Sequence, residues 1–443
     1  MNPKGQGTTS SYRMKVADPG SQAEPVTAMA PEQILGAIEQ ALPFDRFKNQ
    51  RVLTIVPDGT RTAPIGDIFK ALHGLVAADA RAFDVLIALG THQPMSEAAI
   101  CKRLEIQVEE RASKYSRVRF FNHTWDQPQS LVRVGTLPEN DIKDLTHGRF
   151  AMEVQVDVNR MLFDYDQIII IGPVFPHEVV GFSGGNKYLF PGVGGPEILN
   201  FFHWLGAVVT NPMIIGHKWT PVRRVVDRAA AMIKLPKLCF ALVVHPKGHL
   251  AGLFAGNPES AWDQASELSR QVHITRKPKP FRQILSCSPP MYDELWTAGK
   301  CMYKLEPVLA DGGELIIYAP HLKEISVSHG THIRRIGYHC RDFFLKQWDR
   351  YSMVPWGVLA HSSHVRGLGM YENGVERCRA QVTLASQIPK DLCVQINLGY
   401  RDPNSLRASD FEGRETDGVL LVPKAGEMLF QLDEPAAWAR GET

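Results

Sequence analysis

The sequence predicts an α/β protein of two α/β domains with mainly parallel sheets and an active-site cleft between them. At 443 residues the chain exceeds the size at which one hydrophobic core keeps growing. Short apolar runs alternate with helix-like stretches, the pattern of parallel strands covered by helices. A basic, proline-rich break at residues 274–280 separates two such series. Together these observations indicate two domains of the same class.

In the first series, each apolar run leads through a polar or glycine-rich turn into a helix. The predicted pairs are strand 52–56 with helix 65–76, strand 84–89 with a helix beginning near Ser96, and strand 167–172 with a helix beginning at Pro196. Ser96 is a suitable N-cap, and proline suits the first turn of a helix.

The second series predicts a strand at 284–288, a helix at 293–309 and strands at 314–319 and 392–398. We therefore expect a flexible tail at 1–25, an N-terminal α/β domain at 26–275 and a C-terminal α/β domain at 276–415. The last segment, 416–443, contains an apolar run that can stay with the second domain or return to the first.

Composition limits the classes of partner. The formal net charge is +2, which gives no reason to expect nucleic acid or an anionic membrane. No apolar run is long enough to span a bilayer, and the N-terminus lacks the apolar core of a secretory signal. The seven cysteines are scattered without a C-x-x-C pair, which favours reduced thiols and a cytoplasmic location.

Candidate chemical groups follow three predicted strands of the first domain. Asp58 and Arg61 lie in PDGTRTAP, His92 lies in GTHQPM, and His177 and Lys187 follow strand 167–172. Ligands of α/β proteins bind beyond the carboxyl ends of the strands, so we expect these groups to meet. Asp58 and Arg61 can equally pair with each other, and a single histidine can be structural.

The segment 173–206, PVFPHEVVGFSGGNKYLFPGVGGPEILNFFHWLG, is rich in glycine and holds two histidines and a lysine. It contains neither G-x-G-x-x-G, nor a Walker lysine pattern, nor H-E-x-x-H. Its glycines fit tight turns as well as a ligand cradle.

These blocks resemble those of the nickel-pincer lactate racemase family. The resemblance rests on PHEVVGFSGGNKYLFPG followed by FFH, and on DGTRTAP and GTHQPM, in family order over most of the chain. Ten residues separate His177 from Lys187, and sixteen separate Lys187 from His203, as the family pattern expects.

The resemblance implies a 2-hydroxyacid racemase or epimerase. Its cofactor would be nickel in pyridinium-3-thioamide-5-thiocarboxylic acid mononucleotide, which cofactor-biosynthesis enzymes make, and the first domain would bind it. The implied roles are a covalent tether for Lys187, a nickel ligand for His203, acid/base catalysis for His92 and His177, contact with the cofactor for Asp58, Gly184 and Gly185, and binding of the substrate carboxylate for Arg61.

The side chains suit that chemistry. The hydrogen on Cα of a 2-hydroxy acid is a poor acid, so inversion is easier if it leaves as hydride while a base takes the hydroxyl proton. Two bases with a pKa near neutrality are then needed, and histidine is the natural choice. A hydride acceptor must come from a cofactor.

The second domain departs from the family pattern. DELWTAGKCMYKLEPVL resembles a block that reads tyrosine, glutamine, two variable residues, lysine. Lys300 retains the lysine and can contact the substrate, but Trp296 replaces the tyrosine and Thr297 the glutamine. The shorter threonine predicts a pocket of different shape and a substrate other than lactate, unless a water completes its reach.

A second histidine pair lies in HSSHVRGLGMYENGVE. His361 and His364 have a spacing that would bind metal on a helix, but the glycines at 367, 369 and 374 predict a loop and further ligands are missing. Such a loop could instead place His364 or Arg366 near the substrate.

Two other functions stay open. One is a zinc hydrolase or lyase in which His92, His177 and His203 bind the metal directly. The other is a non-catalytic protein that binds a nucleotide or anion in the glycine-rich cradle.

Overall fold

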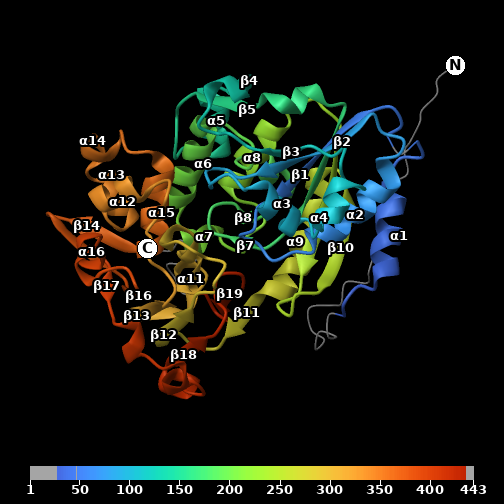
Figure 1. Ribbon diagram of the computed structural model, residues 1–443. Coiled ribbons are helices and arrows are strands. Elements are labelled where there is room, and N and C mark those ends of the chain that lie inside the picture. The colour runs from blue at the N-terminus through green and yellow to red at the C-terminus, as the bar shows by residue number, and fades with distance from the viewer. Residues whose placement is uncertain (1–26, 46, 436–443) are drawn as a thin grey trace.

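The structure of the protein is a computed structural model that describes residues 27–45 and 47–435. The tail predicted at 1–25 and residues 436–443 lie outside this range. Figure 1 shows two α/β units, the first coloured from blue to yellow and the second from orange to red.

The first unit is built on a twisted, mostly parallel sheet. Its strand order is β10 (Leu250–Gly256), β9 (Lys237–Val244), β6 (Gln167–Pro173), β1 (Arg51–Pro57), β2 (Ala82–Ala88) and β3 (Phe120–Asn122). Only β10 runs antiparallel to its neighbour among these strands. The fold class predicted from the sequence is confirmed.

Helices cover both faces of this sheet. One face carries α1 (Pro31–Ala41), α2 (Ile65–Val76) and α3 (Glu97–Arg103), and the other carries α6 (Pro196–Val209), α8 (Pro221–Ala230) and α9 (Pro258–His273). In the central strand β6, Ile169 and Ile171 pack toward the first set, whereas Ile168 and Ile170 pack toward the second. Burial on both faces explains why this strand is an unbroken apolar run.

The predicted helix starts are confirmed. Helix α2 has the predicted bounds. Helix α3 follows Ser96, whose hydroxyl accepts a hydrogen bond from the Ala99 amide at 3.2 Å. Helix α6 begins at Pro196. The strand-to-helix turns therefore lie at one edge of the sheet, where the candidate groups were expected.

The second unit has a parallel sheet in the order β17 (Gly399–Tyr400), β16 (Gln381–Ser386), β13 (Leu309–Ala319), β12 (Phe281–Cys287) and β18 (Val419–Val422). Its helices are α10 (Leu295–Ala298), α11 (Lys300–Tyr303), α12 (Gly330–Ile336), α13 (Arg341–Leu345), α14 (Trp348–Tyr351), α15 (Trp356–Arg366) and α16 (Lys390–Gln395). The smaller remaining elements are α4 (Val108–Ala112), α5 (Glu139–Leu145), α7 (Asn211–Ile214) and the antiparallel pairs β4 (Leu131–Leu137) with β5 (Val154–Asn159), β7 (Pro176–His177) with β8 (Gly181–Phe182), and β14 (Gly369–Glu372) with β15 (Val375–Cys378).

The helix predicted at 293–309 is wrong in its extent. Two short helices, α10 and α11, meet at Gly299, and a 3-10 turn over Glu306–Val308 leads directly into β13. Pro307 lies in that turn, and proline has no amide to continue a helical ladder. The apolar run through Leu309 therefore ends as the start of a strand.

The strand predicted at 392–398 is also wrong, because residues 390–395 form α16. Cys393 and Ile396, the residue that caps the helix, are buried, whereas Val394 is 63% exposed. A spacing of three residues is that of a helix face, but a short run of apolar residues does not reveal it in the sequence.

The break at 274–280 is partly a strand rather than a linker. β11 (Ile274–Lys277) pairs in parallel with β19 (Leu429–Leu432) of the C-terminal segment. The preceding strand of that segment, β18, pairs with β12 in the second sheet. The backbone of the polar stretch β11 is thus satisfied by long-range pairing, which the local sequence does not reveal.

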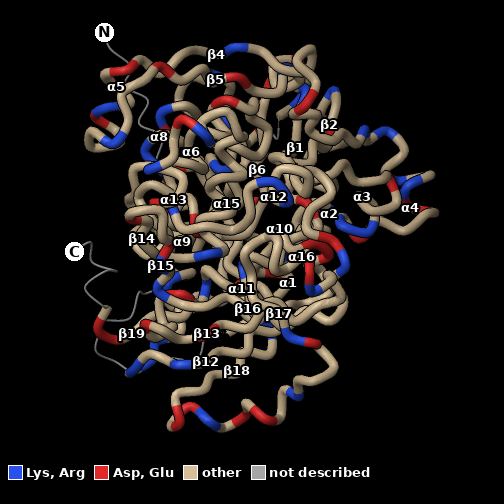
Figure 2. Tube along the Cα trace, turned by 90° about the vertical axis from the view of Figure 1, so that its left-hand side faces the viewer, with Lys and Arg blue, Asp and Glu red and all other residues tan. Residues whose placement is uncertain are grey.

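Residues of both signs of charge are spread along the chain. Lysine and arginine are interspersed with aspartate and glutamate along the trace in Figure 2. Within residues 27–45 and 47–435, no helix is long and apolar enough to cross a membrane.

Candidate active site

A cavity of about 440 Å³ lies between the two units. Nine residues predicted from the sequence line it: Asp58, Arg61, His92, His177, Lys187 and His203 from the first unit, and Trp296, Thr297 and Lys300 from the second. They come from separate strand ends and helices, so the chain had to fold for them to share one space.

Gly184 and Gly185 are not among the residues that line this cavity. Both have positive φ, and a Cβ on Gly184 would lie 2.5 Å from Val174, while one on Gly185 would lie 2.9 Å from Trp262. Turn geometry and close packing therefore account for these two glycines.

His92 is paired with a buried carboxylate. Its Nδ1 lies 2.5 Å from Oδ2 of Asp58, and the other oxygen of Asp58 accepts hydrogen bonds from Thr60 Oγ1 at 2.6 Å and Thr60 N at 3.0 Å. Burial alone would raise the pKa of Asp58, but His92 and Thr60 hold it well below its usual range. The carboxylate therefore fixes the proton on Nδ1 of His92 and leaves Nε2 as a bare acceptor.

Arg61 does not bind Asp58 in the way that the sequence left open. Its Nη1 donates instead to the carbonyl of Thr60 at 3.1 Å. Burial would lower the pKa of Arg61, but the charges of nearby groups, among them Tyr292 and Glu178, raise it. The guanidinium is a fixed cation in the cavity wall.

His177 lies at the end of β7, between two competing partners. Its Nδ1 accepts a hydrogen bond from the Val179 amide at 3.1 Å and lies 3.3 Å from Oε2 of Glu178. Burial, followed by the charges of Lys187 and Arg61, lowers the pKa of His177 well below its ordinary value. The neutral ring bonded to Val179 carries its proton on Nε2.

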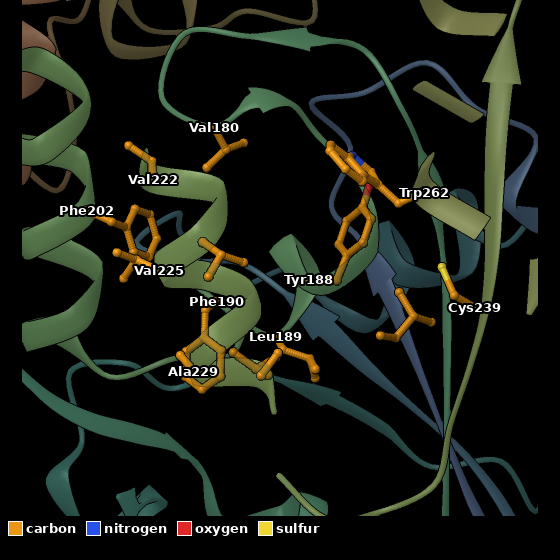
Figure 3. Packing of buried hydrophobic residues seen from close by; sticks show 14 of the residues in the cluster. Val180, Tyr188, Leu189, Phe190, Phe202, Val222, Val225, Ala229, Cys239 and Trp262 are labelled. Carbon is orange, nitrogen blue, oxygen red and sulfur yellow. The ribbon is translucent and has the colours of Figure 1, made fainter. Parts of the chain in front are cut away.

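Lys187 lies in a 3-10 turn over Gly185–Tyr188. The residues that follow it, Tyr188, Leu189 and Phe190, anchor the turn in the core between α8 and α9 (Figure 3). Burial and then the charge of Arg61 lower the pKa of Lys187 to about 8. A substantial share of its amine is therefore neutral and nucleophilic near physiological pH.

His203 lies on α6 with one nitrogen already used. Its Nδ1 is 2.6 Å from the carbonyl of Leu199, one helical turn earlier. The carbonyl can only accept, so Nδ1 carries the proton and the lone pair of Nε2 remains free. Burial lowers the pKa of His203 to about 4. A histidine that binds a metal is usually a neutral imidazole, and its other ring nitrogen is held in place by a hydrogen bond.

The second unit supplies an aromatic wall and a buried lysine. Trp296 stacks on His361 with ring centroids 3.9 Å apart, and Thr297 Oγ1 donates to the carbonyl of Glu294 at 2.9 Å. Lys300 Nζ lies 4.6 Å from the ring centroid of Tyr292. Burial and the charge of Arg61 lower the pKa of Lys300 well below its ordinary value.

The loop predicted around His361 and His364 is wrong. Both residues lie on α15, which ends before Gly367, where φ is +81°. The glycines follow the helix and end it rather than interrupt it. Both histidines are buried and line the cavity, and His361 Nε2 donates to the carbonyl of Trp296 at 2.9 Å.

Arg366, at the end of the same helix, is not among the lining residues, and its Nη1 donates to the carbonyl of Ala380 at 3.4 Å. In the part of the chain that the structure describes, no group of three histidine, cysteine or carboxylate side chains is placed to hold a metal ion.

Sequence reasoning missed several lining residues. These are chiefly Glu178, Tyr303, Trp125 and His329. Glu178 could have been suspected from its place beside His177, but a single glutamate more often marks solvent. The other three had no local signal.

Comparison with known proteins places the chain beside one family. A sequence model of the lactate racemase N-terminal domain matches residues 20–213. Lactate racemase of Thermoanaerobacterium thermosaccharolyticum is 23% identical over 63% of this chain and 61% of its own length. Lactate racemase of Lactiplantibacillus plantarum is 23% identical over 60% of this chain and 59% of its own length.

This chain belongs to the lactate racemase family. It aligns with about three fifths of the length of these two relatives. A protein from Thermotoga maritima has a crystal structure that matches 92% of this chain and 99% of its own, with 34% identity and a TM-score of 0.84. The lactate racemase apoprotein of T. thermosaccharolyticum matches 90% of this chain and 93% of its own, with 16% identity and a TM-score of 0.67, and so shares the fold.

Proposed function

We propose that this protein of the lactate racemase family is a nickel-dependent racemase or epimerase that inverts Cα of a 2-hydroxy acid. The observation that carries the proposal is the meeting of two histidines with different proton arrangements, His92 and His177, in one cavity with the fixed cation of Arg61. Arg61 is the cation, and Lys300 the further hydrogen-bond donor, that would bind the substrate carboxylate.

The side chains fit the family's nickel-pincer nucleotide. Lys187 presents an amine with a pKa of about 8, suited to forming a thioamide. His203 offers a free Nε2 lone pair to nickel. When bound, the nucleotide supplies a reversible hydride acceptor, which no side chain can provide.

His92 is the fixed base of the pair. It would take the hydroxyl proton of one enantiomer on Nε2, and Asp58 would stabilise the resulting imidazolium through Nδ1. His177 would then return a proton to the substrate oxygen from the other side. Its charged form can donate Nδ1–H to Glu178 Oε2, in place of the bond from Val179.

Binding of the cofactor and the substrate would also raise the pKa of His177, as this role requires. After burial, the charges of Lys187 and Arg61 lower its pKa most. Acylation removes the charge of Lys187, and a substrate carboxylate pairs with Arg61. Both changes raise the pKa of His177 toward neutrality, where an acid/base group works best.

The two alternative functions gain no support. A zinc hydrolase would bind the metal through His92, His177 and His203 together, but no group of three metal-binding side chains lies within residues 27–45 and 47–435. A purely binding protein would not require the Asp58–His92 pair.

Chiral chromatography tests the proposal. Protein co-expressed with the cofactor-making enzymes would be incubated with single enantiomers of aliphatic, aromatic, dicarboxylic and sugar 2-hydroxy acids. We expect the opposite configuration at C2 to appear for at least one acid, and His92→Ala or His177→Ala to slow it by about 10²–10⁴-fold. Inversion at the full rate by either variant would contradict the two-base mechanism.

A further inference from the structure

The cavity holds polar groups to which this mechanism assigns no role. They are the hydroxyl of Tyr303, the imidazole of His364 and the second carboxylate oxygen, Oε1, of Glu178. Tyr303 is 3% exposed and His364 is 4% exposed. We call these three residues the polar cluster. It spans both units, since Glu178 follows β7, Tyr303 ends α11 and His364 lies on α15.

The members of the cluster lie close together. The rings of Tyr303 and His364 are 6.1 Å apart, centroid to centroid. Burial and then the charge of Glu178 raise the pKa of the Tyr303 phenol well above its ordinary value. Burial lowers the pKa of His364 to about 4, while Glu178 acts in the opposite direction. At neutral pH the cluster therefore consists of a carboxylate, a phenol and a neutral imidazole.

One atom of the cluster is not satisfied by the protein. Nε2 of His364 is buried and has no hydrogen-bond partner within the described residues. An unpaired buried polar group is costly, and the cost remains if an apolar ligand fills the space beside it. The methyl group of a small aliphatic hydroxy acid would leave the cluster in this state.

A hydroxyl group is the complementary ligand. It donates to a carboxylate or a bare imidazole nitrogen and accepts from a phenol or an imidazole N–H. We propose that the polar cluster binds hydroxyl groups on the carbon chain of the substrate, which makes the substrate a polyhydroxylated 2-hydroxy acid of the sugar-acid class. The inference rests on the proposed racemase function and names its substrate.

The rest of the lining suits such a chain. Arg61 and Lys300 would hold the carboxylate, while Trp125 and Trp296 offer aromatic surface for the C–H groups between the hydroxyls. A site built to bond hydroxyls rejects an analogue that lacks them much more strongly than an apolar pocket discriminates between alkyl chains.

Calorimetric binding to the cofactor-free protein tests the inference directly. The probes are the six-carbon aldonates gluconate, galactonate and mannonate, compared with 2-hydroxyhexanoate, which has the same length, carboxylate and 2-hydroxyl group. We expect at least one aldonate to bind about tenfold or more tightly than 2-hydroxyhexanoate. If every aldonate binds no more tightly than 2-hydroxyhexanoate, the inference is wrong.

Variants of two cluster residues test whether the polar cluster causes the preference for aldonates. Tyr303→Phe and His364→Leu should each reduce the affinity ratio of the best aldonate to 2-hydroxyhexanoate by about three- to tenfold. Tyr371→Phe is the matched control, because Tyr371 lies on β14 against Phe343, and should leave the ratio unchanged. A ratio unchanged in both cluster variants would overturn the inference.

The ribose of the cofactor also carries hydroxyl groups, so loading must be measured separately. Intact mass after co-expression gives the loaded fraction. If Tyr303→Phe and His364→Leu lower the loaded fraction but not the aldonate ratio, the cluster serves the cofactor and the inference falls.

Turnover separates this inference from the proposed function. Inversion of 2-hydroxyhexanoate by the loaded protein, at least as fast as that of every aldonate, would overturn the substrate class and leave the racemase function intact. Tight binding of an aldonate with no inversion of any acid by loaded protein would contradict the racemase function instead.

Discussion

His92 and His177 differ in how their proton positions are controlled. The carboxylate of Asp58 fixes one tautomer of His92 through a 2.5 Å contact. Nδ1 of His177 instead has an amide donor, Val179, and a carboxylate acceptor, Glu178, within reach. One histidine is therefore set as a base, while the other can present or accept a proton at Nε2.

Replacing the carboxylate of Asp58 tests whether it fixes the tautomer of His92. In Asp58→Asn the amide can present its N–H to Nδ1 of His92, which places the imidazole proton on Nε2 and removes the base. We expect kcat to fall by about 10²–10⁴-fold in the loaded protein. Intact mass measures the loaded fraction of each variant, so that kcat is compared per loaded protein.

Asp67→Asn is the control for this variant, because Asp67 is exposed on α2 and should keep full activity. If Asp58→Asn retains the full rate, Asp58 does not control the tautomer of His92.

The lowered pKa of Lys187 gives a second prediction at this scale. An amine-reactive acylating reagent, applied to the cofactor-free protein across a pH series, should modify Lys187 with a midpoint near pH 8, since burial and Arg61 set its pKa at about 8. Exposed lysines should follow a midpoint near 10.4. Peptide mass spectrometry measures both midpoints in one sample. A midpoint for Lys187 above 10 would show that burial and Arg61 do not lower its pKa.

The candidate residues at strand ends were predictable because the parallel fold brings those ends to one edge. Asp58, His92 and Lys187 follow buried strands whose apolar runs are clear in the sequence. Tyr303 was not predictable as a lining residue, and His364 was expected near the substrate only as part of a loop, because both reach the cavity through the docking of the second unit. Their local sequence does not differ from that of core residues.

At the scale of elements, α6 connects the site to both cores. Phe202 and Leu205 pack in the core of the first unit, while Trp204 packs in that of the second. The indole of Trp204 stacks on Trp348 with centroids 5.7 Å apart. The helix that carries His203 is therefore held from two sides.

Removing Trp204 should loosen this helix. We expect Trp204→Ala to lower the free energy of unfolding by about 3–5 kcal/mol, because the side chain is fully buried. Denaturant titration measures it. The control Phe44→Ala removes a fully exposed ring and should change stability by less than about 0.5 kcal/mol. Equal effects of the two variants would contradict the role of Trp204.

The mispredicted elements lie where the local sequence is compatible with more than one structure. Short apolar runs such as 392–398 fit a strand or a helix, and tertiary packing decides between them. The glycines after His364 suggested a loop because their place beyond the helix end could not be seen without the structure. The long apolar runs of β1, β2 and β6 were predictable because burial on both faces leaves few alternatives.

At the scale of the whole molecule, polar contacts join the two units around the cavity. Lys304 Nζ donates to the carbonyl of Pro176 in the first unit. Glu427 accepts from the Thr62 amide at 3.0 Å. Gln93 Nε2 donates to Ser328 Oγ at 2.6 Å. These contacts close the cleft on more than one side.

The buried lysines predict an unusual dependence of stability on pH. Burial lowers the pKa of Lys304 to about 7, although Glu178 opposes it, and that of Lys187 to about 8. Between pH 7 and 9 the unfolded chain holds these protons and the folded protein releases them, so stability rises with pH.

Calorimetry of the cofactor-free protein should therefore show Tm increasing from pH 7 to pH 9. In Lys304→Met the increase should be smaller, because one of the titrating groups is gone. A Tm that falls over this range, or an equal slope in the variant, would show that Lys304 is not a buried neutral amine.

The most direct test of the central claim is peptide mass spectrometry of active protein purified after co-expression with the cofactor-making enzymes. The account predicts a covalent adduct on Lys187, with racemase activity proportional to the modified fraction and both lost in Lys187→Ala. Active protein in which Lys187 is unmodified would contradict it.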